Sequence, residues 1–172
     1  KKDYITFNDA LKSRAPSAFS SMIKPMGSAC NLNCAYCYYL DKAHTIYEDN
    51  QPVMSYEILE KYIIQYISGN EVPEVTFVWH GGEPLLAGID FYRKAVELQK
   101  RYASGKTIIN SLQTNGIMMN ADWARFFHEN RFLIGVSIDG PKDIHDAYRV
   151  NKAGRPSYEK VMGAISLMKQ YG

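Results

Sequence analysis

The chain has 172 residues, of which 46% are hydrophobic and 22% charged, and its formal net charge is +2. This is the composition of an ordinary globular protein, and a chain of this length buries about 70% of its unfolded surface in one domain. The small net charge, with basic residues scattered along the chain, argues against nucleic acid or a membrane surface as a partner. No apolar run has transmembrane length and no signal-peptide core follows Lys1, so a cytoplasmic location is expected.

Short apolar runs alternate along the chain with segments of helical periodicity. The pattern predicts strands over residues 21–27, 75–79, 106–113 and 132–138, and helices that begin at Ser55, Asp90, Asn120 and Ser157. Pro25 cannot donate to a strand ladder, so the first strand is expected to lie at a sheet edge or to end there. Residues 132–138 (FLIGVSI) are expected to form the most clearly buried strand. Four consecutive βα units predict an α/β fold with a parallel sheet, either an open doubly wound sheet or part of a βα barrel.

The three cysteines of the chain, Cys30, Cys34 and Cys37, lie in one short segment with C-x3-C-x2-C spacing. A cubane iron–sulfur cluster has four irons that each bind one thiolate, so three cysteines can hold it and leave one iron open. A small chelating cofactor can then bind that iron directly. The spacing therefore predicts a 4Fe-4S cluster with one open iron.

Zinc and disulfides are the alternative uses of these cysteines. Zinc wants a fourth ligand, and His44, seven residues after Cys37, would complete a Cys3His set in a non-catalytic zinc-binding module. Structural zinc sites usually consist of two separated ligand pairs, whereas the cysteines here form one cluster. Disulfides are disfavoured because the number of cysteines is odd and cysteine is sparse. Zinc therefore stays open as an alternative.

Polar motifs follow each of the predicted strands. In parallel βα folds the loops at the carboxyl ends of the strands converge on one face, where binding residues gather. Besides the cysteine segment, these loops carry HGGEP (80–84), QTNG (113–116) and SIDGP (137–141). Each of the three is also consistent with a simple turn. Taken together, they predict a binding site at that end of the sheet.

The motifs CNLNCAYCYYL, WHGGEPLL, SLQTNG, VSIDGP, HDAYR and GRPSYEKV together resemble the radical S-adenosylmethionine enzymes related to the anaerobic sulfatase-maturating enzymes. The resemblance runs from Met22 to the end of the chain and implies a partial parallel βα barrel, with about four βα units present here. It implies a 4Fe-4S cluster and S-adenosylmethionine, whose cleavage gives a 5'-deoxyadenosyl radical. The implied reaction oxidises a sulfatase cysteine or serine to Cα-formylglycine. Another peptide-modifying radical enzyme is the alternative.

The resemblance also implies roles for individual residues. Cys30, Cys34 and Cys37 would bind the cluster. The implied contacts with S-adenosylmethionine are Tyr36 at the adenine, the backbone of Gly81, Gly82 and Glu83 at the methionyl amine, and Ser137 and Arg149 at the carboxylate and ribose. Glycines permit close approach of the backbone to a ligand, and arginine suits bidentate binding of a carboxylate. Gln113 and Asn115 are candidates for contact with the cofactor or the substrate.

The resemblance finally implies a domain organisation and partners. Residues 1–20 are expected to be an N-terminal extension, and residues 21–172 the N-terminal part of a radical S-adenosylmethionine core. The last barrel units, an auxiliary-cluster region and the acidic substrate base are expected beyond Gly172. The expected partners are a sulfatase polypeptide or another peptide substrate and a one-electron reductant such as flavodoxin or ferredoxin, with no nucleic acid and no membrane.

Overall fold

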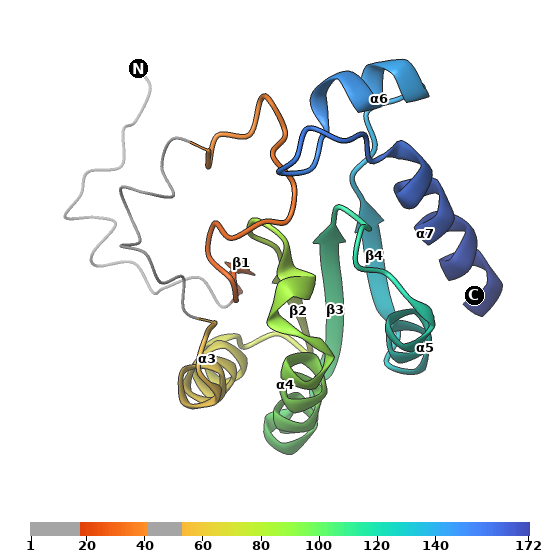
Figure 1. The fold of residues 1–172 in the computed structure, drawn as a ribbon. Helices are drawn as coiled ribbons and strands as arrows, with labels where there is room; N and C mark the ends of the chain where they lie inside the picture. The colour runs from red at the N-terminus through yellow and green to blue at the C-terminus, as the bar shows by residue number, and fades with distance from the viewer. Residues whose placement is uncertain (1–17, 41–52) are drawn as a thin grey trace, which may run out of the picture.

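A computed structural model describes residues 18–40 and 53–172 of the chain. Its strands form one parallel sheet in the order β1-β2-β3-β4, with bounds Ser21–Ile23, Glu74–Trp79, Thr107–Thr114 and Phe132–Val136. The helices are α3 (Tyr56–Gly69), α4 (Ile89–Tyr102), α5 (Ala121–Glu129), α6 (Lys142–Tyr148) and α7 (Tyr158–Tyr171), and the 3-10 helix η1 (Pro84–Ala87) follows β2. The predicted α/β fold with a parallel sheet is confirmed (Figure 1).

The strand order decides between the two predicted architectures. Each strand pairs with the next strand along the chain, so the order never reverses. Because βα crossovers are right-handed, such a sheet carries its helices on one face, whereas a doubly wound sheet reverses at a switch point. In Figure 1, α3, α4 and α5 lie along the same face of the sheet. The chain therefore forms part of a βα barrel, in agreement with the predicted four units.

The hydrophobic core lies between these helices and the sheet. Val75, Phe77 and Trp79 alternate along β2 and are almost completely buried. The ring of Trp79 contacts Tyr92 of α4 edge-on, with 5.4 Å between the ring centroids. Its indole N–H donates to Asn110 Oδ1 on β3 at 2.8 Å, so this buried polar group has a partner. The core thus anchors the two central strands, whose carboxyl ends carry the candidate site.

Capping side chains begin two of the helices where the sequence predicts. Ser55 Oγ accepts a hydrogen bond from the Ile58 N–H at 3.2 Å, and Asn120 Oδ1 accepts one from the Trp123 N–H at 3.0 Å. The second helix starts one residue before the predicted Asp90, after Gly88 at φ = 83°. No helix in residues 18–40 or 53–172 has both the length and the apolar character needed to cross a membrane.

The first strand is shorter than predicted. It ends at Ile23 because residues 24–27 form a turn, in which the Gly27 N–H donates to the Lys24 carbonyl at 3.0 Å. The strand lies at a sheet edge, as Pro25 indicated. Sequence periodicity did not predict η1 and α6, because neither is long enough to show an apolar repeat.

The prediction that residues 132–138 form the most clearly buried strand is wrong. β4 ends at Val136, and Leu133 in its middle is 70% exposed. The reason is its position, since β4 lies at an edge of the described sheet and only one of its faces packs against helices. An apolar run records which residues can be buried, but the neighbouring elements decide which of them are.

Candidate functional site

The loops after the four strands meet around one cavity of about 270 Å³. All three cysteines line it. So does every other residue that the sequence predicts for cofactor binding except Glu83: Tyr36, Gly81, Gly82, Gln113, Asn115, Ser137 and Arg149. The cysteine segment (orange in Figure 1) lies beside the carboxyl end of β3, where such a site is expected in a parallel sheet. The predicted site residues are thus brought together from the ends of the four strands and from the segment that follows α6.

The cysteine segment is held against a distant part of the chain. The N–H groups of Asn33 and Ala35 donate to the carbonyls of Val150 and Tyr148, at 2.8 and 2.9 Å. Within the segment, the Cys37 N–H donates to the Cys34 carbonyl at 2.9 Å and closes a turn. Backbone hydrogen bonds with residues 148–150 therefore position the cysteines relative to Arg149.

The surroundings of the sulfurs suit metal-bound thiolates. Burial raises the pKa of the Cys30 and Cys34 thiols, so as free thiols they stay protonated. The Leu32 N–H lies 3.4 Å from Cys30 Sγ and the Asn115 amide lies 3.6 Å from it, and such donors stabilise a thiolate once it forms. A partly buried site with donors on the sulfur is the environment in which cysteines hold iron.

Three cysteines can hold a cluster without sharing one metal ion. Within the described ranges, no three His, Cys, Asp or Glu side chains lie close enough together to share one metal ion. In a cubane cluster each thiolate binds a different iron, so the sulfurs line a common cavity without meeting at one point. Cys30, Cys34 and Cys37 all line the same cavity.

Gly81 and Gly82 allow the loop after β2 to pack against the backbone that leads into the cysteines. A Cβ on Gly82 would clash with the carbonyl oxygens of Ser28 and Ala29, and Gly81 has φ = 128°. The N–H groups of Gly82 and Glu83 donate to the carbonyls of Gly27 and Ala29, at 2.9 and 2.7 Å. The close approach that requires glycine at position 82 is thus made to the backbone of residues 28 and 29.

The side chain of Glu83 lies behind the cavity wall. It is fully buried and its carboxylate accepts from Thr114 Oγ1 at 2.7 Å and from the N–H groups of Leu85 and Asn115 at 3.0 and 2.8 Å. Burial raises the pKa of Glu83, and these three donors oppose the shift. Its carboxylate therefore joins the loop after β2 to the carboxyl end of β3.

Gln113 and Ser137 form a pair on the rim. Gln113 Nε2 donates to Ser137 Oγ at 3.0 Å. The amide of Gln113 lies across Gly135 of β4, where any Cβ would clash with Gln113 Oε1. The absence of a side chain at position 135 therefore gives Gln113 its place beside the cavity.

Tyr36 and Arg149 meet at Asp139, a residue that was not among the predicted site residues. Arg149 Nε donates to Asp139 Oδ2 at 2.9 Å, and the Tyr36 hydroxyl donates to the same oxygen. Burial, followed by the hydrogen bond to Asp139, raises the pKa of Tyr36 to about 12. Burial alone would raise the pKa of Asp139, but the hydrogen bonds from Arg149 and Tyr36 together lower it. Asp139 could have been predicted from the sequence, because it is the carboxylate of the SIDGP motif and lies between Ser137 and Arg149.

Two buried polar residues support this group, and sequence reasoning did not find them either. His145 is fully buried, and its Nε2 lies 2.9 Å from Ser157 Oγ. Ser157 Oγ in turn donates to the Arg149 carbonyl at 2.6 Å. They position the backbone of Arg149 from behind, and nothing in the local sequence distinguishes them from surface residues.

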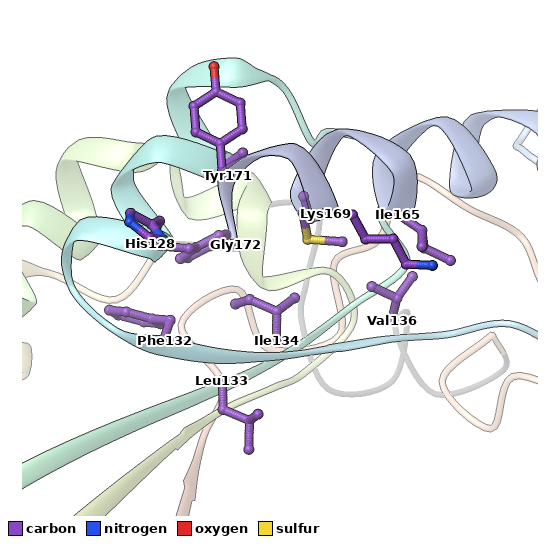
Figure 2. A pocket seen from close by; sticks show the side chains of 12 residues that line it. His128, Phe132, Leu133, Ile134, Val136, Ile165, Lys169, Tyr171 and Gly172 are labelled. Carbon is purple, nitrogen blue, oxygen red and sulfur yellow. The ribbon is translucent and has the colours of Figure 1, made fainter.

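A second cavity, of about 460 Å³, lies away from the cysteines between β4, α5 and α7 (Figure 2). Phe132, Ile134 and Val136 line it from the strand, and Ile165 lines it from α7. Leu133 points away from it on the other side of β4 (Figure 2). The walls of this second cavity are mainly apolar, and no cysteine lines it.

A protein-family model described as the radical SAM superfamily matches residues 25–172. The chain belongs to this superfamily. Superfamily members use a 4Fe-4S cluster and S-adenosylmethionine. The residues around the cavity fit both, since three cysteines leave one iron open and polar groups from four loops face the same space.

Among curated relatives, the chain is 54% identical over 151 residues to the serine-type anaerobic sulfatase-maturating enzyme of Bacteroides thetaiotaomicron. It is 41% identical over 157 residues to the cysteine-type enzyme of Clostridium perfringens. These alignments cover 88% of the chain but only 36% and 41% of the relatives. The chain thus spans well under half the length of these radical SAM relatives.

Solved structures give the same relationship. One described as native anSMEcpe with bound AdoMet superposes with a TM-score of 0.80 at 39% identity, over 87% of the chain and 41% of that structure. Another, native anSMEcpe with bound AdoMet and Cp18Cys peptide, superposes with a TM-score of 0.79 at the same identity, over 87% of the chain and 39% of that structure. The radical SAM fold of the described part is therefore matched over nearly the whole chain.

Proposed function

We propose that this chain is the cofactor-cleaving part of an anaerobic sulfatase-maturating enzyme, which oxidises a cysteine or serine of a sulfatase polypeptide to Cα-formylglycine. The observation that carries the proposal is the meeting of Cys30, Cys34 and Cys37 with residues from three other loops at one cavity. The identity to serine-type relatives is higher than the identity to cysteine-type relatives, so a serine peptide is the first substrate to test.

Each part of the chain has a stated task in this proposal. When bound, a reduced cluster supplies the electron that cleaves S-adenosylmethionine and so starts hydrogen abstraction from the substrate. Tyr36 would pack on the adenine, and the carbonyls of the turn at Gly81 and Gly82 would accept from the methionyl amine. Arg149 uses its Nε for Asp139, so its Nη groups are the donors for the cofactor carboxylate. Ser137 would assist there, and Gln113 would lie nearest the substrate.

The reaction requires partners beyond this chain. Converting the CH2OH of a serine to an aldehyde removes two hydrogen atoms. One is carried away in 5'-deoxyadenosine, and the other leaves as a proton to a base and an electron to an acceptor. The base is expected beyond Gly172. A one-electron reductant such as flavodoxin or ferredoxin would supply the first electron, and a reducing compartment such as the cytoplasm keeps the thiolates available.

Metal analysis tests the cluster assignment. Replacing Cys30, Cys34 or Cys37 singly by Ala in the anaerobically reconstituted complete polypeptide should remove the iron and sulfide of one 4Fe-4S cluster and leave those of any auxiliary cluster, because each cysteine holds its own iron. His44, which lies outside the described residues, provides the control, and His44→Ala should retain iron and sulfide. Zinc without sulfide in the wild-type protein, lost on His44→Ala, would establish the zinc-binding alternative instead.

Product analysis tests the substrate. The complete polypeptide, reduced anaerobically with S-adenosylmethionine and a peptide carrying a sulfatase-type serine or cysteine motif, should form 5'-deoxyadenosine together with a peptide aldehyde. Mass spectrometry of the peptide detects the product. If 5'-deoxyadenosine forms without any aldehyde, the radical chemistry stands and the substrate is another peptide. The 172-residue chain alone is expected to form no aldehyde, because the substrate base is expected beyond its end.

A further inference from the structure

Hydrogen bonds to neighbouring residues fix the orientation of the Asn115 side-chain amide. Its Oδ1 accepts from the Ile117 N–H at 3.0 Å, which places its amino group on the opposite side. That group donates to Asn31 Oδ1 at 2.7 Å and lies 3.6 Å from Cys30 Sγ. Asn115 is only 7% exposed, and these hydrogen bonds hold its amide in this position.

The backbone of Asn115 is fixed from behind by Glu83. The Asn115 N–H donates to Glu83 Oε2 at 2.8 Å, and the neighbouring Thr114 hydroxyl donates to Glu83 Oε1 at 2.7 Å. The Thr114 hydroxyl oxygen also accepts from the Gly116 N–H at 3.0 Å. Glu83 does not line the cavity, and all three of its hydrogen bonds are made to the chain. Its side chain is therefore placed to orient Asn115 and not to contact a ligand.

We propose that Asn115 is a positioning residue for the Cys30 thiolate that raises the reduction potential of the cluster, and that the buried Glu83 carboxylate holds Asn115 in place for this task. The proposal rests on the cluster assignment made above. It assigns Asn115 to the cluster and not to S-adenosylmethionine, and it gives the Glu83 side chain a role separate from that of its backbone.

The direction of the effect follows from charge. Reduction adds one negative charge to the cluster and its thiolates, and an N–H donor on a ligating sulfur stabilises that extra charge. Removing the donor therefore makes the cluster harder to reduce. The Leu32 N–H donates to the same sulfur at 3.4 Å, so the loss of Asn115 weakens the hydrogen bonding of Cys30 without abolishing it.

The test is a redox titration of the complete, anaerobically reconstituted polypeptide, followed by electron paramagnetic resonance. The cluster with the open iron is identified by the change of its signal when S-adenosylmethionine is added. Asn115→Ser keeps a short acceptor for the Ile117 N–H but cannot reach Cys30. It should lower the ratio of reduced to oxidised cluster about tenfold at a given potential, which is a shift of about 59 mV for one electron. Asn115→Asp, which keeps the acceptor and adds a negative charge, should shift further in the same direction.

Asn120→Ser is the matched control, because serine caps α5 as asparagine does and the residue lies at an exposed helix start. It should leave the potential unchanged. A wild-type potential in Asn115→Ser and Asn115→Asp, both with full iron and sulfide, would overturn the inference while the cluster assignment stands. Absence of iron and sulfide from the wild-type protein would instead overturn the cluster assignment.

A double-mutant cycle isolates the role of Glu83. Glu83→Gln removes a nearby negative charge, and this through-space effect raises the potential equally with or without Asn115. Glu83→Gln also frees the Asn115 side chain from its position, and this second effect lowers the reduction potential only when Asn115 is present. The shift caused by Glu83→Gln should therefore be less positive in the wild-type background than in Asn115→Ser. Equal shifts in both backgrounds would remove Glu83 from the proposal.

Discussion

Arg149 forms an ion pair with Asp139 through its Nε atom. The pair is largely buried, and the guanidinium carbon lies 5.5 Å from the centre of the Tyr36 ring. One carboxylate thus orients two of the residues that the resemblance assigns to the cofactor, Tyr36 and Arg149. These contacts show that Arg149 is not simply a solvated arginine in a loop.

Arg149→Ala in the complete polypeptide should weaken S-adenosylmethionine binding by about 1.5–3 kcal/mol, the usual size of a lost hydrogen bond to a charged group. Isothermal titration calorimetry under anaerobic conditions measures the change, and the iron content should stay the same. Arg155→Ala is the control, since Arg155 lies in the same segment with its side chain exposed. Equal affinities for the wild type and Arg149→Ala would exclude Arg149 from the cofactor site.

The ion pair between Asp139 and Arg149 should contribute to stability in a pH-dependent way. The pKa of Asp139 is lowered in the folded state, so its contribution is complete above the unfolded value of about 3.9 and is lost as the pH falls through the folded value. Asp139→Asn should therefore lower the free energy of unfolding by about 1.5 kcal/mol between pH 5 and 8, and by less below about pH 4. Urea denaturation at several pH values measures this difference.

Asp122→Asn serves as the control for that experiment. Asp122 pairs with Arg125 at 3.3 Å on the exposed side of α5, where an ion pair contributes about 0–1 kcal/mol. Its effect on the free energy of unfolding should be small. If Asp139→Asn behaves like Asp122→Asn, the pair at the cavity orients Arg149 without stabilising the fold.

At the scale of elements, the site is built from loops that are joined by backbone contacts and by the buried side chain of Glu83. The segment after β1 and the loop after β2 meet at Gly82, where only hydrogen fits. The loop after β2 is joined to β3 through Glu83, and the cysteine segment to the end of α6 through Asn33 and Ala35. Because these contacts join the loops to one another, the geometry of the cysteines depends on the packing of all the loops.

Gly82→Ala should show this dependence. The added methyl group would clash with the carbonyls of Ser28 and Ala29, which cannot rotate away as a flexible side chain would, so we expect a loss of about 1–3 kcal/mol in stability. Iron incorporation should fall as well, because the cysteine segment must shift. Thermal unfolding and iron analysis of the complete polypeptide measure the two effects.

Gly163→Ala is the matched substitution within α7, where a Cβ would meet nothing within 4 Å. Alanine favours the helix over glycine, so this variant should be more stable by about 0.5–1 kcal/mol and should bind iron normally. If both variants bind iron equally, the packing at Gly82 does not control the cysteine segment.

At the scale of the whole molecule, the described sheet has two edges, β1 and β4. Met22 on β1 is 55% exposed and Leu133 on β4 is 70% exposed. Open edges with apolar side chains favour pairing with other chains. The isolated 172-residue chain should therefore self-associate, which size-exclusion chromatography with light scattering will show.

Leu133→Lys should reduce this association, because a charged residue on an edge strand opposes edge-to-edge pairing. Ile58→Lys provides the control, since Ile58 is similarly exposed but lies on α3, away from the sheet edges. A monodisperse, cooperatively unfolding monomer of the wild-type chain would contradict the prediction.

The sequence alone determined the chemistry and the kind of fold. Cysteine spacing and alternating periodicities are local features, and they suffice to predict the cluster and the parallel sheet. Of the eight non-cysteine residues that were predicted to bind the cofactor, chiefly through the resemblance of the strand-end motifs, all but Glu83 line the cavity. The tertiary structure decided what depends on neighbours far along the chain. It exposed Leu133 at an edge, buried His145, brought Asp139 between Tyr36 and Arg149, and turned Glu83 away from the cavity toward Asn115. Burial and pairing are properties of residues that pack together, and a single stretch of sequence does not contain them.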